Sequence, residues 1–339
     1  MSTNTGFDPN SAASADSGVF GLPYGENEST LVFLPVPWEA TTSYGGGTSQ
    51  GPQAILAASR QVDLFDLDVL KPYEAGMFFL PESDKILKLN EKAKLLKSDP
   101  RAMNEAGAEL NRFVHEETRR LLANGKIVGL VGGDHSTPFG ALQAIAEKNQ
   151  SFGILHFDAH SDTREAFEDF TWSHASILFN VLENIPQVKK LVQVGIRDVC
   201  EQEVEYIHGQ GERVKTYFDL DLAKWKFSGA SWAKICEEIV SQLPNDVWVS
   251  FDIDGLDPRF CPHTGTPVPG GLDFNEANFL LATVVRSGRR IIGFDLNEVA
   301  PDPTGQSEWD ANVGARLLYK LSAWTLASQG KAKLNSFRA

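Results

Sequence analysis

The chain has 339 residues, 42% of them hydrophobic and 22% charged, which is enough to bury the core of one large domain or two ordinary ones. Its formal net charge of −14 argues against binding to nucleic acids or anionic membranes, because such binding requires basic patches. Three widely spaced cysteines, no leader-like N-terminus and no 18-residue apolar run predict an unexported, cytoplasmic protein.

Residues 1–30 are rich in Ser, Asn, Gly and Asp, so a flexible N-terminal arm is expected, either disordered or packed on a neighbouring subunit. Residues 31–37 form the first expected strand. The glycine-rich loop 41–52 lacks the Lys of a phosphate-binding loop, which argues against nucleotide binding. Its glycines predict a close approach of the backbone to a ligand or a subunit. A helix is expected at 53–59, with Pro52 at its start.

Strands and helices then alternate to the end of the chain. Further strands are expected at residues 63–70, 76–80, 127–131, 152–157, 191–195, 247–251 and 290–296. Helices are expected at residues 83–97, 103–122, 137–148, 174–183, 231–243, 275–287 and 310–328. This alternation predicts parallel strands with helices outside them, in either an open doubly wound sheet or a closed barrel. Residues 31–328 contain no repeat or linker, so a single domain is expected there, followed by a tail at 329–339.

Three of the expected strands end in side chains of the kinds that bind metals. These side chains are His135, Asp158, His160, Asp162, Asp252 and Asp254. Residues two apart in an extended chain point to the same side, and sites in parallel sheets form at the carboxyl ends of the strands. An unpaired buried carboxylate is costly, so the pattern predicts a cation site. A solvated turn with helix-capping residues is the alternative for any one segment.

Four carboxylates and two imidazoles make an oxygen-rich donor set without a thiolate. Zinc sites usually have four ligands with more His or Cys, so six ligands indicate two ions of higher coordination number. Mn²⁺ fits this set best, and Ni²⁺, Co²⁺ or Fe²⁺ are compatible with it. Two such ions about 3.5 Å apart can share a water, lower its pKa and orient it as a nucleophile.

Three motifs resemble the signatures of the ureohydrolase family, which contains arginases, agmatinases, guanidino-acid hydrolases and formimidoylglutamase. They are G-G-D-H-S at 132–136, H-F-D-A-H-S-D at 156–162 and S-F-D-I-D-G-L-D-P at 250–258. The resemblance covers residues 31 to 328, so a single ureohydrolase domain is expected there. It implies an arginase-like three-layer α/β/α sandwich with an eight-stranded parallel sheet, and it selects the open sheet over the barrel. Relatives are commonly trimers or hexamers, so a homo-oligomer is expected.

The resemblance also implies how the two ions are held. One would be bound by His135, Asp158, Asp162 and Asp252. The other would be bound by Asp158, His160, Asp252 and Asp254. Asp158 and Asp252 would therefore span both ions, and all six positions match the family pattern.

The implied reaction is hydrolysis of a C–N bond in a guanidino compound, which releases urea. Asp162 is expected to pass a proton to the leaving nitrogen. Glu298, after a fourth strand, is expected to grip the guanidinium through charge-assisted hydrogen bonds, and His174 to help move protons at the substrate. Thr264 matches the loop beside the guanidinium. His263 departs from the small residue usual in arginases and is expected to alter substrate access.

Two further residues near the motifs are expected to have supporting roles. His156 lies inside a strand and is interpreted as a core residue or as a support for the ligand Asp158. Asp134 is expected to orient a neighbouring ligand.

Arg164 is the departure that bears on substrate choice, because arginases carry Asn at this position and formimidoylglutamase carries Arg. Arg pairs bidentately with carboxylates, which favours arginine, a guanidino acid or formimidoylglutamate as substrate. The alternative is a structural ion pair with Glu165, Glu168 or Asp169. Other readings also stay open: amidine hydrolysis of the formimidoylglutamase type, hydrolysis of free guanidine or an alkylguanidine, and a non-catalytic metal-binding relative.

Overall fold

The structure is a computed structural model that describes residues 7–14, 16–42 and 44–335. Eight strands form one parallel sheet, in the spatial order β3-β1-β4-β9-β8-β5-β6-β7. They are β1 (Leu31–Val36), β3 (Met77–Phe79), β4 (Ile127–Gly132), β5 (Phe152–Phe157), β6 (Val188–Ile196), β7 (Val214–Phe218), β8 (Asp246–Asp252) and β9 (Arg290–Asn297). The eight-stranded parallel sheet expected from the resemblance is confirmed.

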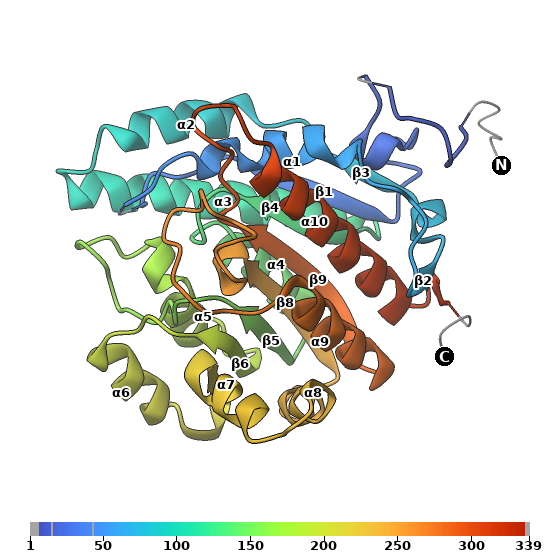
Figure 1. Ribbon diagram of the computed structural model, residues 1–339. Helices are drawn as coiled ribbons and strands as arrows, with labels where there is room; N and C mark the ends of the chain where they lie inside the picture. Colours follow the sequence, from blue (N-terminus) through green and yellow to red (C-terminus); the bar gives the residue numbers. More distant parts are fainter. Residues whose placement is uncertain (1–6, 15, 43, 336–339) are drawn as a thin grey trace.

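Helices cover both faces of the sheet (Figure 1). One face carries α1 (Gly51–Ser59), α7 (Asp219–Phe227), α8 (Trp232–Ser241), α9 (Phe274–Arg286) and α10 (Trp309–Ser328). The other carries α2 (Asp84–Lys94), α3 (Pro100–Ala123), α4 (Phe139–Lys148), α5 (Ile177–Asn184) and α6 (Glu201–Gly209). Every residue of β1, β4 and β5 is buried, because helices exclude water from both of their faces. The result is an open three-layer sandwich, so the barrel alternative is wrong.

Local sequence signals explain where several helices begin. The Asp99 side chain accepts the Ala102 N–H at the start of α3, and Pro100 occupies the first turn, where its missing N–H costs nothing. At α9, the side chains of Asp273 and Glu276 form a reciprocal capping box. These caps satisfy N–H groups that would otherwise lack partners at the helix ends.

The structure differs from the predicted elements in two regions. The expected strand 63–70 is reduced to β2 (Val69–Leu70), which pairs antiparallel with β10 (Lys333–Leu334) outside the main sheet. The Asp66 carboxylate accepts the N–H groups of Asp68 and Val69, which favours a turn there. Residues 201–227, left unassigned from sequence, form α6, β7 and α7. They escaped prediction because β7 is a short, half-polar edge strand.

Part of the expected flexible arm is packed into the core. Val19, Phe20 and Leu22 are buried, and the Phe20 ring contacts Phe33 and Tyr319 at centroid distances of 6.1 and 4.9 Å. For these residues the expectation of a loose segment is wrong, because three apolar side chains suffice to anchor it. Residues 1–6 of the arm and 336–339 of the tail lie outside the described residues.

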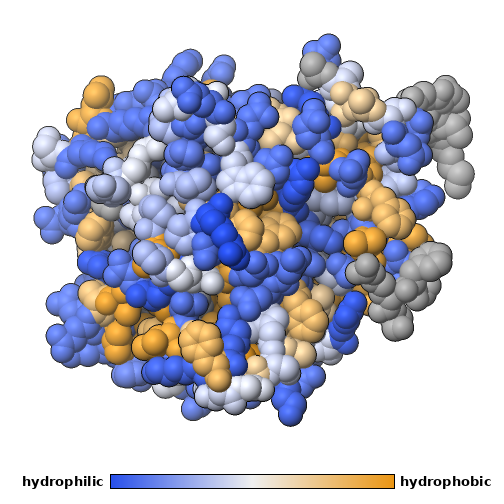
Figure 2. Space-filling view, in the orientation of Figure 1, coloured by the Kyte–Doolittle hydropathy of each residue, from blue (hydrophilic) through white to orange (hydrophobic). Residues whose placement is uncertain are grey.

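Figure 2 shows a largely hydrophilic side with apolar side chains in several separate areas. Exposed large apolar side chains belong to distant elements, including Phe227 in α7, Phe65 before β2 and Trp309 in α10. Within the described part of the chain, no helix is both long enough and apolar enough to cross a bilayer.

Candidate metal centre and active site

Four adjacent strands in the middle of the sheet deliver the candidate site. The strands β4, β9, β8 and β5 are neighbours and parallel, so their carboxyl ends meet at one edge. His135 follows β4, Glu298 follows β9, Asp252 ends β8 and Asp158 follows β5. Asp254 lies in the 3-10 turn Ile253–Gly255 after β8, where the Asp252 side chain accepts its N–H.

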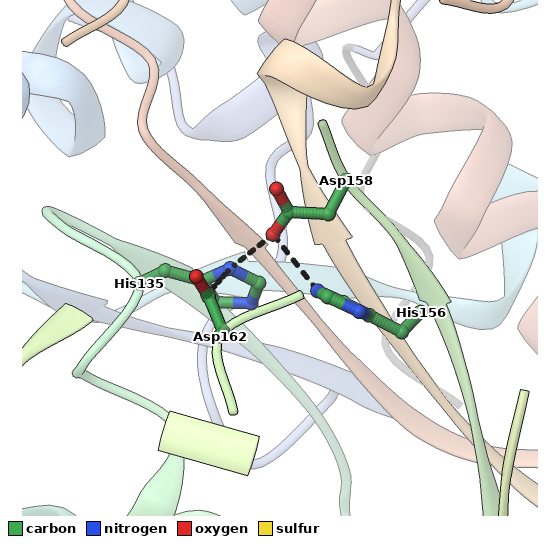
Figure 3. Close-up of side chains that lie close together, drawn as sticks. All are labelled: His135, His156, Asp158 and Asp162. Carbon is green, nitrogen blue, oxygen red and sulfur yellow. Dashed lines mark hydrogen bonds and ion pairs between the residues drawn. The ribbon is translucent and has the colours of Figure 1, made fainter. Parts of the chain in front are cut away.

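Asp158 lies between two groups of metal-ligand atoms. Its Oδ2 is 3.0 Å from His135 Nδ1 (Figure 3). Its Oδ1 is 3.4 Å from His160 Nδ1. His135 Nδ1 is also 3.1 Å from Asp162 Oδ2 and 3.3 Å from Asp252 Oδ2. His160 Nδ1 is 3.1 Å from Asp254 Oδ2. The structure therefore brings all six predicted ligands into two groups that share Asp158.

The charges in this site favour cations. All four aspartates of the two groups are buried, and among the described residues none of them pairs with Lys or Arg. Burial raises the pKa of Asp252, and the neighbouring carboxylates of Asp254 and Asp158 raise it further. Uncompensated buried carboxylates are costly, so the donor set fits two divalent ions. The residues present thus suit the metal centre that the resemblance implies.

The two imidazoles respond to the same carboxylates. Burial lowers the pKa of His135, but the facing carboxylates outweigh it and raise this pKa well above its ordinary value. Burial also opposes the charged form of His160, yet Asp254 and Asp158 raise the pKa of His160 to about 12. Both rings are therefore protonated at neutral pH until a cation replaces the proton.

Buried polar groups support the ligands from behind. His156 Nε2 lies 2.8 Å from Asp158 Oδ2, and His156 Nδ1 accepts Gln193 Nε2 at 3.2 Å. A Gln193 N–H donated to Nδ1 leaves Nε2 as the nitrogen that donates to Asp158, and His156 also lies among the metal-ligand atoms around Asp158. On the other side, His135 Nε2 lies 2.9 Å from Ser250 Oγ, which donates to Asp295 at 2.8 Å.

Two acidic residues of the site adopt left-handed backbone conformations. Asp162 has φ 57° and Glu298 has φ 62°, a region that non-glycine residues rarely occupy. Hydrogen bonds hold both in place: the Leu178 N–H donates to the Asp162 carbonyl, and the Glu298 N–H donates to the Gly133 carbonyl. Such conformations cluster at functional sites because the surrounding structure offsets their cost.

A cavity of about 170 Å³ adjoins the candidate metal centre. Its lining joins the candidate ligands His160 and Asp162 to His174, Arg164 and Thr266. Phe167, Asp198 and Glu203, none of them predicted, complete much of its wall. The cavity therefore offers both signs of charge beside the metal ligands.

Arg164 reaches this cavity but is held by a residue that the sequence did not suggest. Its Nε lies 3.5 Å from Glu203 Oε2, and its guanidinium carbon lies 4.8 Å from the centre of the Phe167 ring. No ion pair to the expected partners Glu165, Glu168 or Asp169 occurs among the described residues, so that expectation is wrong. The terminal nitrogens of Arg164 have no hydrogen-bond partner in the described part of the chain.

Glu298 and His174 line a smaller recess, together with Tyr44, Gly45 and Thr266. Glu298 Oε1 accepts the N–H of His135 at 2.9 Å, which ties it to the metal centre. Burial raises the pKa of Glu298 well above its ordinary value, and the charge of Asp134 adds to this. Burial lowers the pKa of His174.

Two residues predicted near the substrate have other contacts. Thr264 is buried and absent from the lining of both cavities, and its hydroxyl donates to the Glu298 carbonyl at 2.8 Å. His263 does not line either cavity, because Asp310 Oδ2 holds its Nδ1 at 2.8 Å. The expected influence of His263 on substrate access has no support in these contacts.

The glycine-rich loop approaches another loop of the same chain. The Gly45 N–H donates to the Gly265 carbonyl at 3.2 Å, and a Cβ on Gly45 would lie 2.8 Å from that oxygen. A larger residue would force the two loops apart. A close approach of this loop therefore occurs within the chain, with the backbone of residue 265 as its partner.

The chain is similar to known proteins over most of its length. A family model described as the Arginase family matches residues 29–323. The N(1)-aminopropylagmatine ureohydrolase of Thermus thermophilus is 32% identical over 306 residues, covering 89% of this chain and 92% of that protein. Proclavaminate amidinohydrolase of Streptomyces clavuligerus is 32% identical over 303 residues, covering 86% and 87%. The crystal structure of agmatine ureohydrolase of Thermoplasma volcanium has the same fold, with a TM-score of 0.73, 21% identity and coverage of 93% and 96%.

Metal binding should release protons. Ligand imidazoles must be neutral, whereas His135 and His160 have raised pKa values in the metal-free protein, so loading at pH 7 should displace about two protons per chain. Apparent metal affinity should accordingly fall as the pH is lowered. Calorimetric titration with Mn²⁺ in two buffers of different ionisation enthalpy measures the number released.

His115→Gln is the matched control, because His115 pairs with Glu147 at 2.7 Å away from the metal centre. This variant should release as many protons as the wild type, and His160→Gln should release fewer. Metal binding without proton release would contradict the assignment.

Proposed function

Because this chain belongs to the arginase family, we propose that it hydrolyses a C–N bond of a guanidino compound and releases urea. It is a hydrolase of linear amidines, as are the relatives named ureohydrolase and amidinohydrolase. The observation that carries the proposal is the double cluster around Asp158, with Glu298 bonded to the backbone of His135 beside it. A guanidinium is cationic and resists attack by neutral water, so its hydrolysis needs both an acidic binding site and an activated nucleophile.

Two divalent cations are the cofactor in this proposal. The first would be held by His135, Asp158, Asp162 and Asp252. The second would be held by Asp158, His160, Asp252 and Asp254. The mixed carboxylate and imidazole donors favour Mn²⁺, and Ni²⁺, Co²⁺ or Fe²⁺ fit the same donors. Such a pair of ions, when bound, supplies an activated water at neutral pH.

Glu298 binds the substrate guanidinium. Its buried carboxylate accepts one hydrogen bond from the His135 N–H and keeps lone pairs for the N–H groups of a substrate. A bound guanidinium supplies the positive charge that favours the ionised form of this acid. Thr264 contributes to substrate binding through Glu298, whose carbonyl accepts its hydroxyl.

Asp162 and His174 exchange protons with the substrate. Both line the cavity beside the metal centre. Burial lowers the pKa of His174, which favours the neutral imidazole. Asp162, ionised as a metal ligand, takes a proton from the attacking water and passes it to the nitrogen that departs, and His174 returns protons between the site and solvent.

Arg164 recognises the far end of the substrate. Its terminal nitrogens are free of hydrogen bonds to described residues and belong to a side chain that lines the cavity. A guanidinium fork in that position matches a carboxylate, which supports a guanidino acid as substrate. Formimidoylglutamate carries carboxylates as well and is the amidine alternative.

A substrate with a cationic tail is the second candidate. Glu203 and Asp198 line the same cavity as Arg164, so the cavity wall carries more acidic side chains than arginines. The relatives named after aminopropylagmatine and agmatine support this candidate. The two candidates predict opposite responses to removal of Arg164.

Location and assembly complete the proposal. A cytoplasmic location is supported by Cys200, Cys236 and Cys261, all of which are free thiols. A trimer or hexamer is supported by the family resemblance.

The activity is tested by measuring urea released from arginine, agmatine, guanidinobutyrate and guanidine, with Mn²⁺ and with Ni²⁺. Formimidoylglutamate is assayed by release of its amide product. At least one guanidino compound should yield urea, and Glu298→Gln should lower kcat/KM roughly 10²-fold because one charged partner of the guanidinium is lost. Glu308→Gln, at an exposed position, should match the wild type. Absence of turnover with every compound and both metals would refute the proposal.

The Arg164→Ala variant distinguishes a substrate with a carboxylate tail from a substrate with a cationic tail. For a guanidino acid, KM should rise about 10- to 100-fold with a smaller change in kcat, since a charge-assisted hydrogen bond is lost. For a substrate with a cationic tail, KM should stay the same or fall. Arg101→Ala is the control, because Arg101 is exposed and pairs only with Glu105 among the described residues. An unchanged KM for guanidinobutyrate would exclude carboxylate recognition by Arg164.

A further inference from the structure

His174 is held by a residue far away in the sequence. Thr41, in the glycine-rich loop, lies with its Oγ1 at 3.1 Å from the His174 backbone nitrogen and at 3.4 Å from the ring Nδ1. The Phe167 ring meets the imidazole edge to face, with a centroid distance of 6.1 Å. No described residue hydrogen-bonds the His174 Nε2, and the residue lines both cavities of the site. Nδ1 of the ring thus has a hydrogen-bond partner, whereas Nε2 has none among the described residues.

The Thr41 hydroxyl has a second partner, the buried carboxylate of Asp134. Asp134 Oδ2 accepts Thr41 Oγ1 at 2.9 Å and the Thr41 N–H at 3.3 Å. Its Oδ1 accepts the N–H of Ser136 at 3.1 Å and the Ser136 hydroxyl at 2.5 Å. Each carboxylate oxygen therefore meets one backbone N–H and one hydroxyl, and both hydroxyls donate to it.

A hydroxyl has a single hydrogen, so this arrangement fixes the direction of the next hydrogen bond. The Thr41 hydroxyl donates its only hydrogen to Asp134, so it can only accept hydrogen bonds from His174. The His174 backbone N–H occupies one of these lone pairs. A hydrogen bond between Thr41 Oγ1 and the ring must then be donated by Nδ1, which has to carry the proton.

The loop that carries Thr41 is anchored independently of the site. Glu39 Oε2 accepts the N–H groups of Gly47 and Ser49 at 2.6 and 3.1 Å, and Glu39 Oε1 pairs with Lys94 at 2.5 Å. The Thr42 hydroxyl donates to the Glu39 carbonyl at 3.0 Å. These bonds fix both ends of the loop, so Thr41 is held in place against the ring.

We propose that Thr41 is a positioning residue which, together with Asp134, holds neutral His174 as the tautomer with its proton on Nδ1 and a bare Nε2 at the cavity. The reaction role of that nitrogen rests on the proposed function, whereas the tautomer itself does not. A proton that passes through His174 then enters at Nε2 to give an imidazolium and leaves from Nε2. Nδ1 keeps its proton throughout, so Thr41 stays an acceptor in every step.

Ser173 is the other oxygen near Nδ1 and supplies a matched control. Its Oγ lies 3.5 Å from His174 Nδ1 and accepts the Ala175 N–H at 3.3 Å. No carboxylate takes the hydrogen of this hydroxyl among the contacts of the described residues. Ser173 can therefore either donate to Nδ1 or accept from it and does not select a tautomer.

The test measures the tautomer directly in the full-length protein loaded with diamagnetic Zn²⁺. Nitrogen-15 NMR of labelled histidines reports which ring nitrogen of His174 carries the proton, with the signals assigned by their loss in His174→Gln. The wild type, Thr41→Ser and Ser173→Ala should show a protonated Nδ1. Thr41→Val should show a proton shifted toward Nε2, and Thr41→Ala provides the same deletion should the valine variant fail to fold.

Kinetics supply the second readout, with the best metal and substrate of the urea assay. Thr41→Val should lower kcat about 10- to 100-fold with KM within about threefold, and Thr41→Ser should restore kcat. A protonated Nδ1 that persists in Thr41→Val and Thr41→Ala would overturn the proposal, as would a tautomer change in Ser173→Ala. If the wild type released no urea, the proposed function would fail while the NMR result would still decide the tautomer.

Discussion

Burial of four aspartates at one edge of the sheet is the constraint on which the rest of the structure depends. Removing a carboxylate from water costs several kcal/mol unless charge or hydrogen bonds compensate it. Asp158, Asp162 and Asp252 all lie within 3.3 Å of one His135 nitrogen, and no Lys or Arg of the described chain pairs with any of the four. A protonated imidazole compensates part of this charge, and divalent cations compensate it fully. The site is therefore suited to divalent cations, whose charge offsets the charge of the buried carboxylates around them.

The fold makes that concentration of charge possible. Four parallel strands end side by side, and each places one or two buried polar side chains at or just after its carboxyl end. Buried groups such as Asp295, Ser250 and Gln193 then orient the ligands from behind. The loops that carry Thr41 and Arg164 adjoin this centre, where Thr41 contacts His174 and Arg164 lines the cavity.

Most of the candidate metal ligands stand out in the sequence because Asp158, His160 and Asp162 lie two residues apart after one strand, as do Asp252 and Asp254 after another. Thr41 could not be predicted, since 133 residues separate it from His174 and only the tertiary fold brings them together. The same applies to Glu203, whose sequence context indicates a helix start and whose pairing with Arg164 joins the first turn of α6 to the loop after β5. Phe20 shows a related limit: a polar segment was expected to be loose, although a few apolar side chains anchor it in the core.

The most direct test is anomalous diffraction from crystals soaked in Mn²⁺, recorded on both sides of the manganese absorption edge. Two element-specific peaks should appear, one on each side of the Asp158 carboxylate, with His135 and His160 as ligands of different ions. A single peak, or peaks that avoid Asp158, would contradict the account of a two-ion centre.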